Sequence, residues 1–352
     1  MTMDDYITNG NTIIFSPKYN KPLSSELNIQ TSIQYRKIIF SDYELDIELF
    51  EVYENNNGHN LEYNGQKMVY GGLKFNQCLG SSLDNCISLT HIIFGIMFNQ
   101  PLSNALYNCT VLTHIVFGAH FNQPLSNALD NCTSLTHINF GWNFNQSLSN
   151  ALDNCISLTH IVFGNGFNQP LHNALYNCIL LTNIVFDTMF NQPISNSLDN
   201  CISLTHISFG YRFNQPLSDV LYNLPSLTHL GLDHYFNQKN VLPNNIHSIS
   251  LDCNNEFYTE YLPDTIEEIE FDEYFNLELD NCPSSIKKLI FIKYSNYNKE
   301  LNCLPPGMSI LQLPRGYNQQ IQNIPPGLKK LICSKNYIFI NDFSNIEVET
   351  YQ

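Results

Sequence analysis

Apolar residues recur along the middle of this 352-residue chain with a period of 23 residues. The motif Phe-Asn-Gln begins eight times at this spacing, at Phe75, Phe98, Phe121, Phe144, Phe167, Phe190, Phe213 and Phe236. A fixed period in this range is the sequence signature of a solenoid, in which each repeat forms one turn of a coil. Because solenoids mostly offer long surfaces to partners, the period favours binding over catalysis.

Within each repeat, counted from its first Phe, positions 1, 5, 9, 15, 18 and 20 are apolar in nearly every copy. In the copy that spans 121–143 these positions are Phe121, Leu125, Leu129, Leu135, Ile138 and Phe140. Positions 15 to 20 predict a short strand. Because strand side chains alternate, Ile138 and Phe140 are expected to point inward, and His137 and Asn139 outward.

The opposite side of each repeat predicts a helical piece. Positions 5 and 9 lie four residues apart and share one face of a helical turn. Ser126, at position 6, stands where a side-chain oxygen can cap free backbone N–H groups. We therefore predict an α/β-type repeat solenoid. It is a right-handed coil of about 13 turns, with one parallel β-sheet face and short helical or turn segments opposite.

The repeats change along the chain and define four segments. Residues 1–74 predict an N-terminal cap with degenerate repeats, residues 75–235 form seven regular repeats, residues 236–336 form shorter repeats of 20–22 residues, and residues 337–352 form a C-terminal cap. In the first segment, residues 19–23 resemble a worn copy of the motif, with Ile38–Phe40 as its strand. No Pro/Gly/Ser-rich linker interrupts the chain, so we expect one continuous elongated domain.

Each shorter repeat carries a proline followed by apolar residues three, six and eight positions later. These prolines are Pro243, Pro263, Pro283, Pro305 and Pro325. Because one to three residues are lost, we expect an extended segment or a tight turn opposite the strand there, and no helix. Glu267 and Glu268 fall one turn before Lys287 and Lys288 in the same register, which predicts ion pairs between neighbouring turns.

The formal net charge of −16 is spread unevenly. Residues 75–235 contain seven Asp, one Arg and no Lys, whereas acidic residues concentrate in 42–54 and 256–280. Phosphate binding requires clustered Lys and Arg, so a nucleic-acid partner is not expected. We see no basic segment followed by an apolar run at the N-terminus, and no apolar stretch near the ~20 residues of a membrane span.

Six cysteines occupy position 12 and form a column: Cys86, Cys109, Cys132, Cys155, Cys178 and Cys201. Side chains in register on neighbouring turns place their Cβ atoms about 5 Å apart, whereas disulfides require about 3.5–4.5 Å. We therefore predict buried thiols, and no zinc site because the chain has no C-x-x-C pair.

The repeated Asn at positions 2, 7 and 11 is expected to bond to backbone groups at the corners. For this reason the sequons that begin at Asn108 and Asn131 are interpreted as accidental.

Position 17 forms a column of imidazoles: His91, His114, His137, His160, Asn183, His206 and His229. We expect it on an exposed sheet face, with one side chain every ~4.8 Å. It can be a harmless surface residue that duplication copied, or a contact stripe for a partner. It can also sense pH, because stacked cations repel below a pKa near 6.5. A metal site fits less well, since a straight column offers two ligands at a time and zinc takes three or four.

Position 19 lies beside the imidazoles and is mostly apolar: Ile93, Val116, Asn139, Val162, Val185, Ser208 and Gly231. An apolar stripe on a polar sheet suits a binding face, but strand propensity alone also places Val and Ile there. The candidate partner-binding stripe comprises His91, His114, His137, His160, His206, His229, Val116, Val162 and Val185. No catalytic, cofactor-binding or metal-binding residues are predicted, because the sequence has no G-x-S-x-G, no glycine-rich phosphate loop and no H-E-x-x-H.

Two repeat families resemble these strings. F-N-Q-P-L, as at Phe121, together with L-P-x-x-I-x-x-L-x-F in the later turns, resembles the FNIP repeat. That family is related to the leucine-rich repeats. It is known from social amoebae and from large DNA viruses that infect amoebae. The string N-C-x-S-L-T-H-I, as in Asn131 to Ile138, is similar to the BspA-type leucine-rich repeats of surface and adhesion proteins. Together the resemblance covers about residues 19–337.

The resemblance implies protein binding, with no catalytic residues and no cofactor. We therefore expect a non-enzymatic protein–protein interaction scaffold that binds a protein partner along the exposed parallel-sheet face. One alternative is a structural or surface-exposed adhesive component of a virion or cell surface. Another is a ubiquitin-ligase substrate adaptor, although residues 1–74 lack the Leu-Pro-rich F-box string of some family members. The expected location is the host or cell cytoplasm, or a virion, and the oligomeric state stays open.

Overall fold

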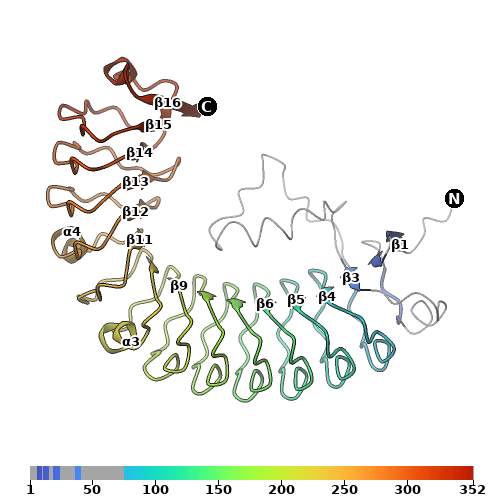
Figure 1. The fold of residues 1–352 in the computed structure, drawn as a ribbon. Helices are drawn as coiled ribbons and strands as arrows, with labels where there is room; N and C mark the ends of the chain where they lie inside the picture. The colour runs from blue at the N-terminus through green and yellow to red at the C-terminus, as the bar shows by residue number, and fades with distance from the viewer. Residues whose placement is uncertain (1–5, 10, 16–18, 24–35, 41–74, 352) are drawn as a thin grey trace. The chain divides into compact units, whose positions relative to one another are not determined.

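The computed structural model describes residues 6–9, 11–15, 19–23, 36–40 and 75–351. The chain divides into two compact units, unit 1 (residues 1–204) and unit 2 (residues 205–352). Within each unit the strands follow one another in chain order, and after the antiparallel pair at the start of unit 1 each turn of the coil contributes one strand (Figure 1). The prediction of a repeat solenoid with one sheet face is confirmed.

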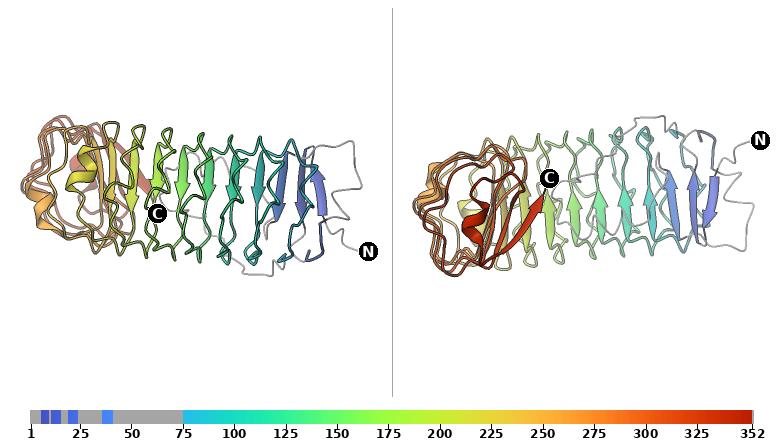
Figure 2. Two further views of the ribbon diagram at one scale, coloured as in Figure 1. Left: turned by 90° about the horizontal axis from the view of Figure 1, so that it is seen from below. Right: turned by 90° about the horizontal axis from the view of Figure 1, so that it is seen from above.

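Unit 1 holds the first eight strands. They are β1 (Tyr6–Asn9), β2 (Thr12–Phe15), β3 (Lys37–Phe40), β4 (His91–Ile93), β5 (His114–Val116), β6 (His137–Asn139), β7 (His160–Val162) and β8 (Asn183–Val185). β1 and β2 are antiparallel, and every neighbouring pair from β2 to β8 is parallel. Figure 2 shows the strands of this unit as a row of arrows. The string Ile38–Phe40 lies in β3, but the acidic stretch 42–54 falls outside the described residues.

Unit 2 holds eight strands and three short helices. They are β9 (His206–Phe209), α3 (Ser218–Tyr222), β10 (His229–Leu232), β11 (Ser248–Leu251), α4 (Glu256–Glu260), β12 (Glu268–Phe271), β13 (Lys288–Phe291), β14 (Ile310–Gln312), β15 (Lys330–Ser334), η1 (Ile340–Phe343) and β16 (Glu347–Tyr351). All neighbouring pairs from β9 to β16 are parallel. How the four predicted segments group into domains stays a prediction.

The core of unit 1 is built from two columns of Phe rings, at positions 1 and 20 of the repeat. Phe140 at position 20 stacks on Phe144 of the following repeat with ring centroids 4.3 Å apart, and on Phe163 of the next turn at 5.4 Å. Both Phe140 and Phe144 are at most 1% exposed. A single turn cannot bury these rings, so stacking against neighbours supplies the burial that stabilises the coil.

The strand prediction holds in detail. In β6, Ile138 is buried, whereas the flanking His137 and Asn139 lie on the outer face of the sheet and are half-buried. Phe140, directly after the strand, returns to the core. This arrangement follows from the alternation of side chains along a strand.

Of the short helical or turn segments predicted opposite the strand, the described repeats of unit 1 have turns, and the helical piece suggested by positions 5 and 9 does not form there. In the copy 121–143 the chain makes successive tight turns, with the N–H of Ala128 donating to the carbonyl of Leu125 at 2.9 Å and that of Cys132 to Leu129 at 2.9 Å. Asn127 has φ = +59°, and its counterparts at position 7 in the next three repeats are also left-handed. A right-handed helix cannot continue through such a residue, and Asn tolerates the conformation better than most residues. Ser126 therefore caps no helix in this repeat.

α-Helices occur instead in two turns of unit 2. In the repeat that begins at Phe213, position 7 is Asp219, and the segment folds as α3. The expectation that the shorter repeats contain no helix is wrong at α4, where the side chain of Asn255 accepts a hydrogen bond from the N–H of Phe257. An Asn at this position supplies the acceptor that a helix N-terminus lacks, which accounts for a helix in one short repeat.

Asparagine side chains form the predicted ladder at the corners. In unit 1, Asn122 Oδ1 accepts the N–H of Asn145 at 2.9 Å and the Nε2 of Gln146 at 3.1 Å, and the same pair of bonds recurs along the repeats. At position 11, Asn131 Nδ2 donates to the carbonyl of Tyr107 at 2.8 Å. In unit 2 the ladder continues between Asn298 and Asn318. The Asn columns at positions 2 and 11 thus bond to backbone groups, as predicted. At position 7 the observed feature of Asn is its left-handed backbone.

The cysteine column of unit 1 consists of free thiols, as predicted. Burial raises the pKa of Cys132 to about 12, with a contribution from Asp130, and raises the pKa of Cys178 to about 12, with a contribution from Asp153. A thiol with so high a pKa carries almost no thiolate at neutral pH and is unreactive.

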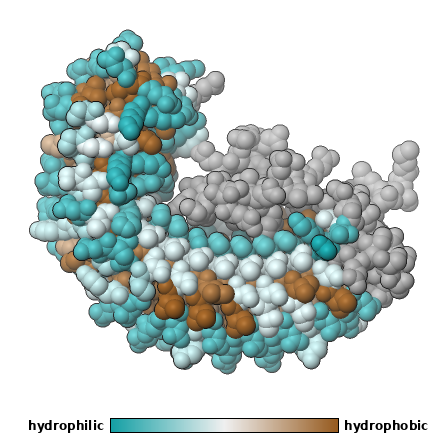
Figure 3. Space-filling view, viewed as in Figure 1, coloured by the Kyte–Doolittle hydropathy of each residue, from teal (hydrophilic) through white to brown (hydrophobic). Residues whose placement is uncertain are grey.

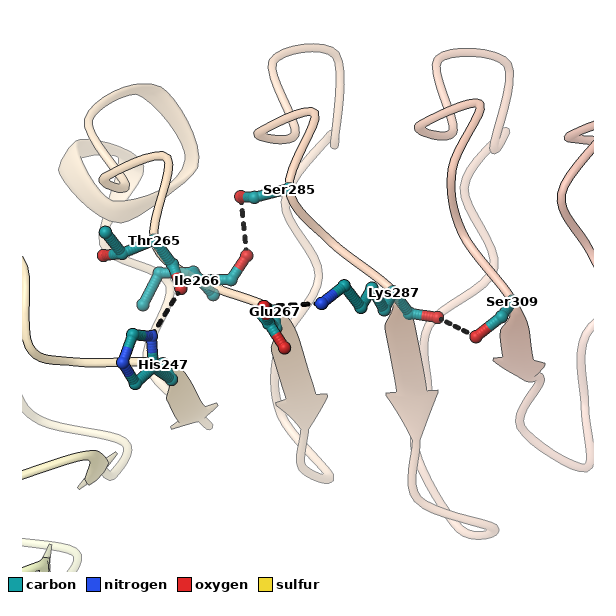
Figure 4. Close-up of polar contacts among 7 residues, drawn as sticks. All are labelled: His247, Thr265, Ile266, Glu267, Ser285, Lys287 and Ser309. Carbon is teal, nitrogen blue, oxygen red and sulfur yellow. Dashed lines mark hydrogen bonds and ion pairs between the residues drawn. The ribbon is translucent and has the colours of Figure 1, made fainter.

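The charged strand positions of unit 2 pair across neighbouring turns. Lys287 Nζ lies 2.6 Å from Glu267 Oε1, and Lys288 Nζ lies 2.6 Å from Glu268 Oε1. Figure 4 shows the first of these pairs beside hydrogen bonds that join side chains to backbone carbonyls of neighbouring turns. The predicted ion pairs between turns are confirmed.

Candidate functional site

The sheet face of unit 1 carries the imidazole column, formed by His91, His114, His137 and His160 at the first position of β4 to β7. The register pairs each His with the next one. Neighbouring rings lie face to face, with centroids 4.2, 4.3 and 4.3 Å apart and interplanar angles of 5–9°. Asn183 follows His160 in the register. The sequence predicted the column, and the structure adds that its rings stack.

In unit 2 the column consists of His206 and His229. Their rings stack with centroids 3.9 Å apart, at the first positions of β9 and β10. The next residue in the register is Ser248. The candidate stripe is therefore divided between the two units.

A column of threonines holds the imidazoles of unit 1 in place. From Thr113 onward, the Thr hydroxyl at position 16 donates to the carbonyl of the Thr one turn earlier, as Thr136 Oγ1 does to the carbonyl of Thr113 at 3.0 Å, whereas Thr90 donates to the carbonyl of Arg36. Thr136 Oγ1 also lies 2.8 Å from Nδ1 of His137. Because a hydroxyl has one proton and that of Thr136 goes to the carbonyl, His137 Nδ1 must be the donor. The neutral imidazole therefore carries its proton on Nδ1.

The imidazoles are less exposed than predicted. His114 is only 9% exposed, and the other three rings of the column in unit 1 are half-buried. The reason is tertiary, because each ring is covered by the rings of the neighbouring turns. Burial lowers the pKa of His91 to about 3, with further contributions from His114 and Lys37. Burial also lowers the pKa of His229.

The apolar column lies beside the imidazoles in the same strands. Ile93, Val116, Val162 and Val185 are half-buried at the last positions of β4, β5, β7 and β8, and Asn139 interrupts them in β6. Together with the imidazole column they form a stripe without a charged side chain from β4 to β8. We call this set, His91 to His160 with Ile93 to Val185, the sheet-face stripe.

The stacked imidazoles do not converge on one point. Parallel rings direct their nitrogens the same way, whereas zinc takes three or four ligands around a centre. Among the residues that the structure describes, no group of three His, Cys, Asp or Glu could hold a metal ion.

Two further surface features escaped the sequence interpretation. On one flank of unit 1, positions 13 and 14 expose large apolar side chains, namely Ile87, Val111, Ile156, Ile179, Leu180 and Ile202. Figure 3 shows apolar groups gathered on the turns of this unit. Ile recurs at position 13 in four repeats, and this recurrence could have revealed the row.

The second feature is a set of three Asp residues at the corner of unit 2, of which Asp252 is buried and the other two are half-buried. Asp233, Asp252 and Asp272 each follow a strand directly, where the repeats of unit 1 mostly have Gly. Asp252 is only 7% exposed. The replacement of Gly by Asp at position 21 was the available signal in the sequence.

Within the described part of the chain, no helix is long and apolar enough to cross a membrane.

Comparison with known protein families shows which repeats these are similar to. Residues 79–178 and 149–245 match the BspA type leucine rich repeat region, and residues 236–274 match the FNIP repeat. The regular F-N-Q-P-L block, whose motif resembles the FNIP repeat, is thus matched by the BspA-type family. No curated protein matches the chain significantly.

Solved structures with the same fold include CroV588, a circular leucine-rich-repeat protein of a giant virus. It is 26% identical, with a TM-score of 0.59 over 95% of this chain and 51% of that one. The chain therefore spans about half the length of CroV588. An internalin of Listeria monocytogenes, InlF, is 13% identical, with a TM-score of 0.53 over 77% of this chain and 83% of its own, and shows the fold alone.

Leucine-rich-repeat proteins are typically scaffolds that bind other proteins. The repeat period, the parallel sheets and both family matches agree: residues 79–245 carry BspA-type leucine-rich repeats, residues 236–274 carry a FNIP repeat, and the fold is that of leucine-rich-repeat proteins.

Proposed function

We propose that this chain is a non-enzymatic scaffold that binds a protein partner along the sheet-face stripe of unit 1. The observation that carries the proposal is the stripe itself. Four stacked imidazoles lie beside four half-buried aliphatic side chains, on strands with no charged residue. An ordered, uncharged and partly apolar surface of this kind costs little to desolvate, which favours protein association.

The threonine column makes this surface rigid before any partner arrives. Each imidazole is held by a hydrogen bond to a threonine that is itself bonded to the preceding turn, as with His160, Thr159 and Thr136. A rigid surface loses little conformational entropy on binding. Because the stripe carries no charge, the affinity for the partner is expected to change little with salt, in contrast to a charged interface.

The test is chemical cross-linking followed by mass spectrometry, with the intact chain as bait in amoeba lysate. The variant His114→Glu/His137→Glu/His160→Glu places charges on the stripe, and Ile156→Glu/Ile179→Glu/Ile202→Glu places three on the flank as a matched control. A partner lost with the first variant and kept with the second supports the proposal. The reverse pattern, or equal capture by all three proteins, contradicts it.

Circular dichroism and thermal melting must show that both variants fold. If the Glu variant does not fold, His137→Asn/His160→Asn replaces it, because Asn183 already occupies this column in β8. Roles as a surface or virion component, or as a ubiquitin-ligase adaptor, stay predictions.

A further inference from the structure

The corners that follow the strands of unit 2 form an edge that the proposed function does not use. Each corner consists of the three residues after the second core side chain of its turn, as after Phe271 in β12. Backbone bonds join neighbouring corners, as when the N–H of Arg315 donates to the carbonyl of Lys293 at 2.9 Å. The corners therefore form a row at the strand spacing of ~4.8 Å. We call the six corners from β10 to β15 the corner edge, which comprises residues 233–235, 252–254, 272–274, 292–294, 314–316 and 334–336.

Charges on the corner edge are separated by sign. The charged residues of the corners after β10, β11 and β12 are all acidic, namely Asp233, Asp252, Asp272 and Glu273. Those of the corners after β13, β14 and β15 are Lys or Arg, namely Lys293, Arg315 and Lys335. Glu273, Arg315 and Lys335 are exposed, Asp252 is buried, and the other three are half-buried. The edge thus has an acidic half and a basic half, which meet between β12 and β13.

This separation differs from the arrangement of charges on the sheet face of the same unit. There, opposite charges lie on neighbouring turns and pair, as Lys287 does with Glu267. Among the residues that the structure describes, the ion pairs of unit 2 use Lys287, Lys288, Lys299 and Lys330, and no cation of the corner edge. Like charges on neighbouring turns repel each other. Each half of the edge is therefore suited to a surface of opposite charge outside the chain.

Exposed tyrosine rings lie among these charges. Tyr235, Tyr274 and Tyr294 are 54%, 45% and 55% exposed. The ring of His234 packs edge-on against Tyr235 and Tyr274, with centroids 5.1 and 4.9 Å away, and Lys293 Nζ lies 5.6 Å from the centroid of Tyr294. Tyrosine is enriched at protein interfaces, and rings held by their neighbours lose little entropy on binding. The corner edge therefore offers apolar contact area as well as charge.

We propose that the corner edge binds the corner edge of a second copy of this chain, across a two-fold axis between the β12 and β13 corners. A half rotation about this axis places the acidic half of each copy opposite the basic half of the other. Because both edges have the same turn spacing, Asp233 faces Lys335 of the second copy, and Glu273 faces its Lys293. Arg315 faces the β11 corner, between the carboxylates of the two corners that flank it.

Other occupants satisfy less of the edge. Two copies in parallel orientation would place like charges opposite each other. A purely basic or purely acidic partner would match one half and be repelled by the other. Arg212 follows β9, one corner before the edge, and in the two-fold arrangement it lies beyond Lys335 of the second copy.

The size of the edge sets the expected affinity. Six corners of three residues each fall below the roughly 20–30 residues per partner of a stable interface, so we expect a weak dimer with a Kd on the order of 10 µM. The test is sedimentation velocity of the intact chain at protein concentrations well below and well above this Kd. Raising the salt from about 0.1 M to about 1 M shortens the screening length from about 10 Å to about 3 Å and should weaken the dimer about tenfold.

Reversal of the basic half should abolish the match. Arg315→Glu/Lys335→Glu reverses two exposed cations of the corner edge, so that two copies of this variant face each other with acidic charge along most of the edge. Its Kd should rise about tenfold or more. Lys239→Glu/Lys329→Glu reverses two exposed cations of unit 2 that lie outside the corner edge, and this matched control should dimerise like the unchanged protein.

Reversal of the acidic half supplies the complementary surface. In Asp233→Asn/Asp272→Asn/Glu273→Lys the amide oxygens can still accept the N–H groups of residues 234 and 273, and the edge becomes mostly basic. This variant alone should also dimerise about tenfold more weakly or less well still. An equal mixture of the acidic-half and basic-half variants should form a heterodimer at least as tight as the unchanged dimer, which misfolded variants could not do.

Three outcomes overturn the proposal. They are a monomer at every concentration, a dimer that neither variant weakens more than the control does, and a mixture of the two variants that fails to associate. Circular dichroism checks that the variants fold. If the acidic-half variant does not fold, Glu273→Lys alone replaces it in the mixture, because this side chain is exposed.

Discussion

Unit 1 repeats the same side chains from turn to turn, whereas the turns of unit 2 carry different side chains at the same register. From β4 to β7 every strand begins with His and continues with Ile. From β11 to β15 the first strand residue is Ser, Glu, Lys, Ile and Lys in turn. Both units nevertheless bury the same kind of aromatic and aliphatic columns. The coil therefore depends on its inner columns and tolerates variation on its faces.

The corners after the strands differ most. In unit 1 a Cβ atom on Gly141 would lie 1.8 Å from the carbonyl oxygen of Gly118, and Gly118 approaches Gly95 in the same way. In unit 2 the equivalent residues Asp233, Asp252 and Asp272 carry side chains. The Gly corners of unit 1 can thus approach more closely than corners that carry a side chain.

The largest expected effect tests the shared core. Phe140→Ala in unit 1 and Phe271→Ala in unit 2 each remove a ring that packs against other rings, and each should lower the free energy of unfolding by about 4 kcal/mol. Chemical denaturation of the intact chain measures the loss, and Tyr107→Ala, at a residue 62% exposed, is the control. A loss in only one unit would show that the two cores are not equivalent.

A second change tests the corners. Gly141→Ala forces a methyl group against a backbone oxygen and should cost about 3 kcal/mol. Gly316→Ala in unit 2 meets no atom within 4 Å and should change the stability by less than about 0.5 kcal/mol. Thermal melting of both variants checks the difference, and equal melting temperatures would contradict the close approach of the corners in unit 1.

A third prediction contrasts the imidazole columns under acid. The pKa of His91 is lowered to about 3, so below its ordinary pKa near 6.5 the unfolded chain takes up a proton that the folded chain refuses. The free energy of unfolding should therefore fall as the pH drops, by about 1–2 kcal/mol near pH 4. This figure is smaller than the full pKa shift implies, because solvent screens the partly exposed ring. His91→Asn should flatten this dependence, as followed by hydrogen exchange in β4 and β5. His229→Asn in unit 2 should flatten the pH dependence less, because Glu268 opposes the lowering of the His229 pKa.

The smallest expected effect concerns the ion pairs of unit 2. Glu267 and Lys287 are both more than half exposed, so Glu267→Lys should lower the stability only slightly at low salt, by less than any of the changes above. The double variant Glu267→Lys/Lys287→Glu should recover most of this loss, and high salt should reduce the effect. Denaturation at two salt concentrations checks both points. A loss that salt leaves unchanged would mean that packing, and not charge, is responsible.

Much of the fold was predictable because the inner columns recur with a strict period. The burial of Ile138 and Phe140, the free thiols of the cysteine column and the Asn122 ladder all follow from one period and the alternation of a strand. Failures arose where a short local pattern was interpreted alone. The spacing of Leu125 and Leu129 suits a helix, but left-handed Asn127 between them produces turns.

The sequence by itself determined the coil, the composition of its inner columns and the strand face that carries the imidazoles, because each follows from which residue types repeat and at what spacing. Only the tertiary structure decided how far those imidazoles are buried and which nitrogen of His137 carries the proton. It also decided that Asp252 at the corner of unit 2 is buried, with its carboxylate accepting the N–H of Tyr274. These properties depend on contacts between turns that are about 20 residues apart in the chain, and on the loss of water there, which no local pattern records.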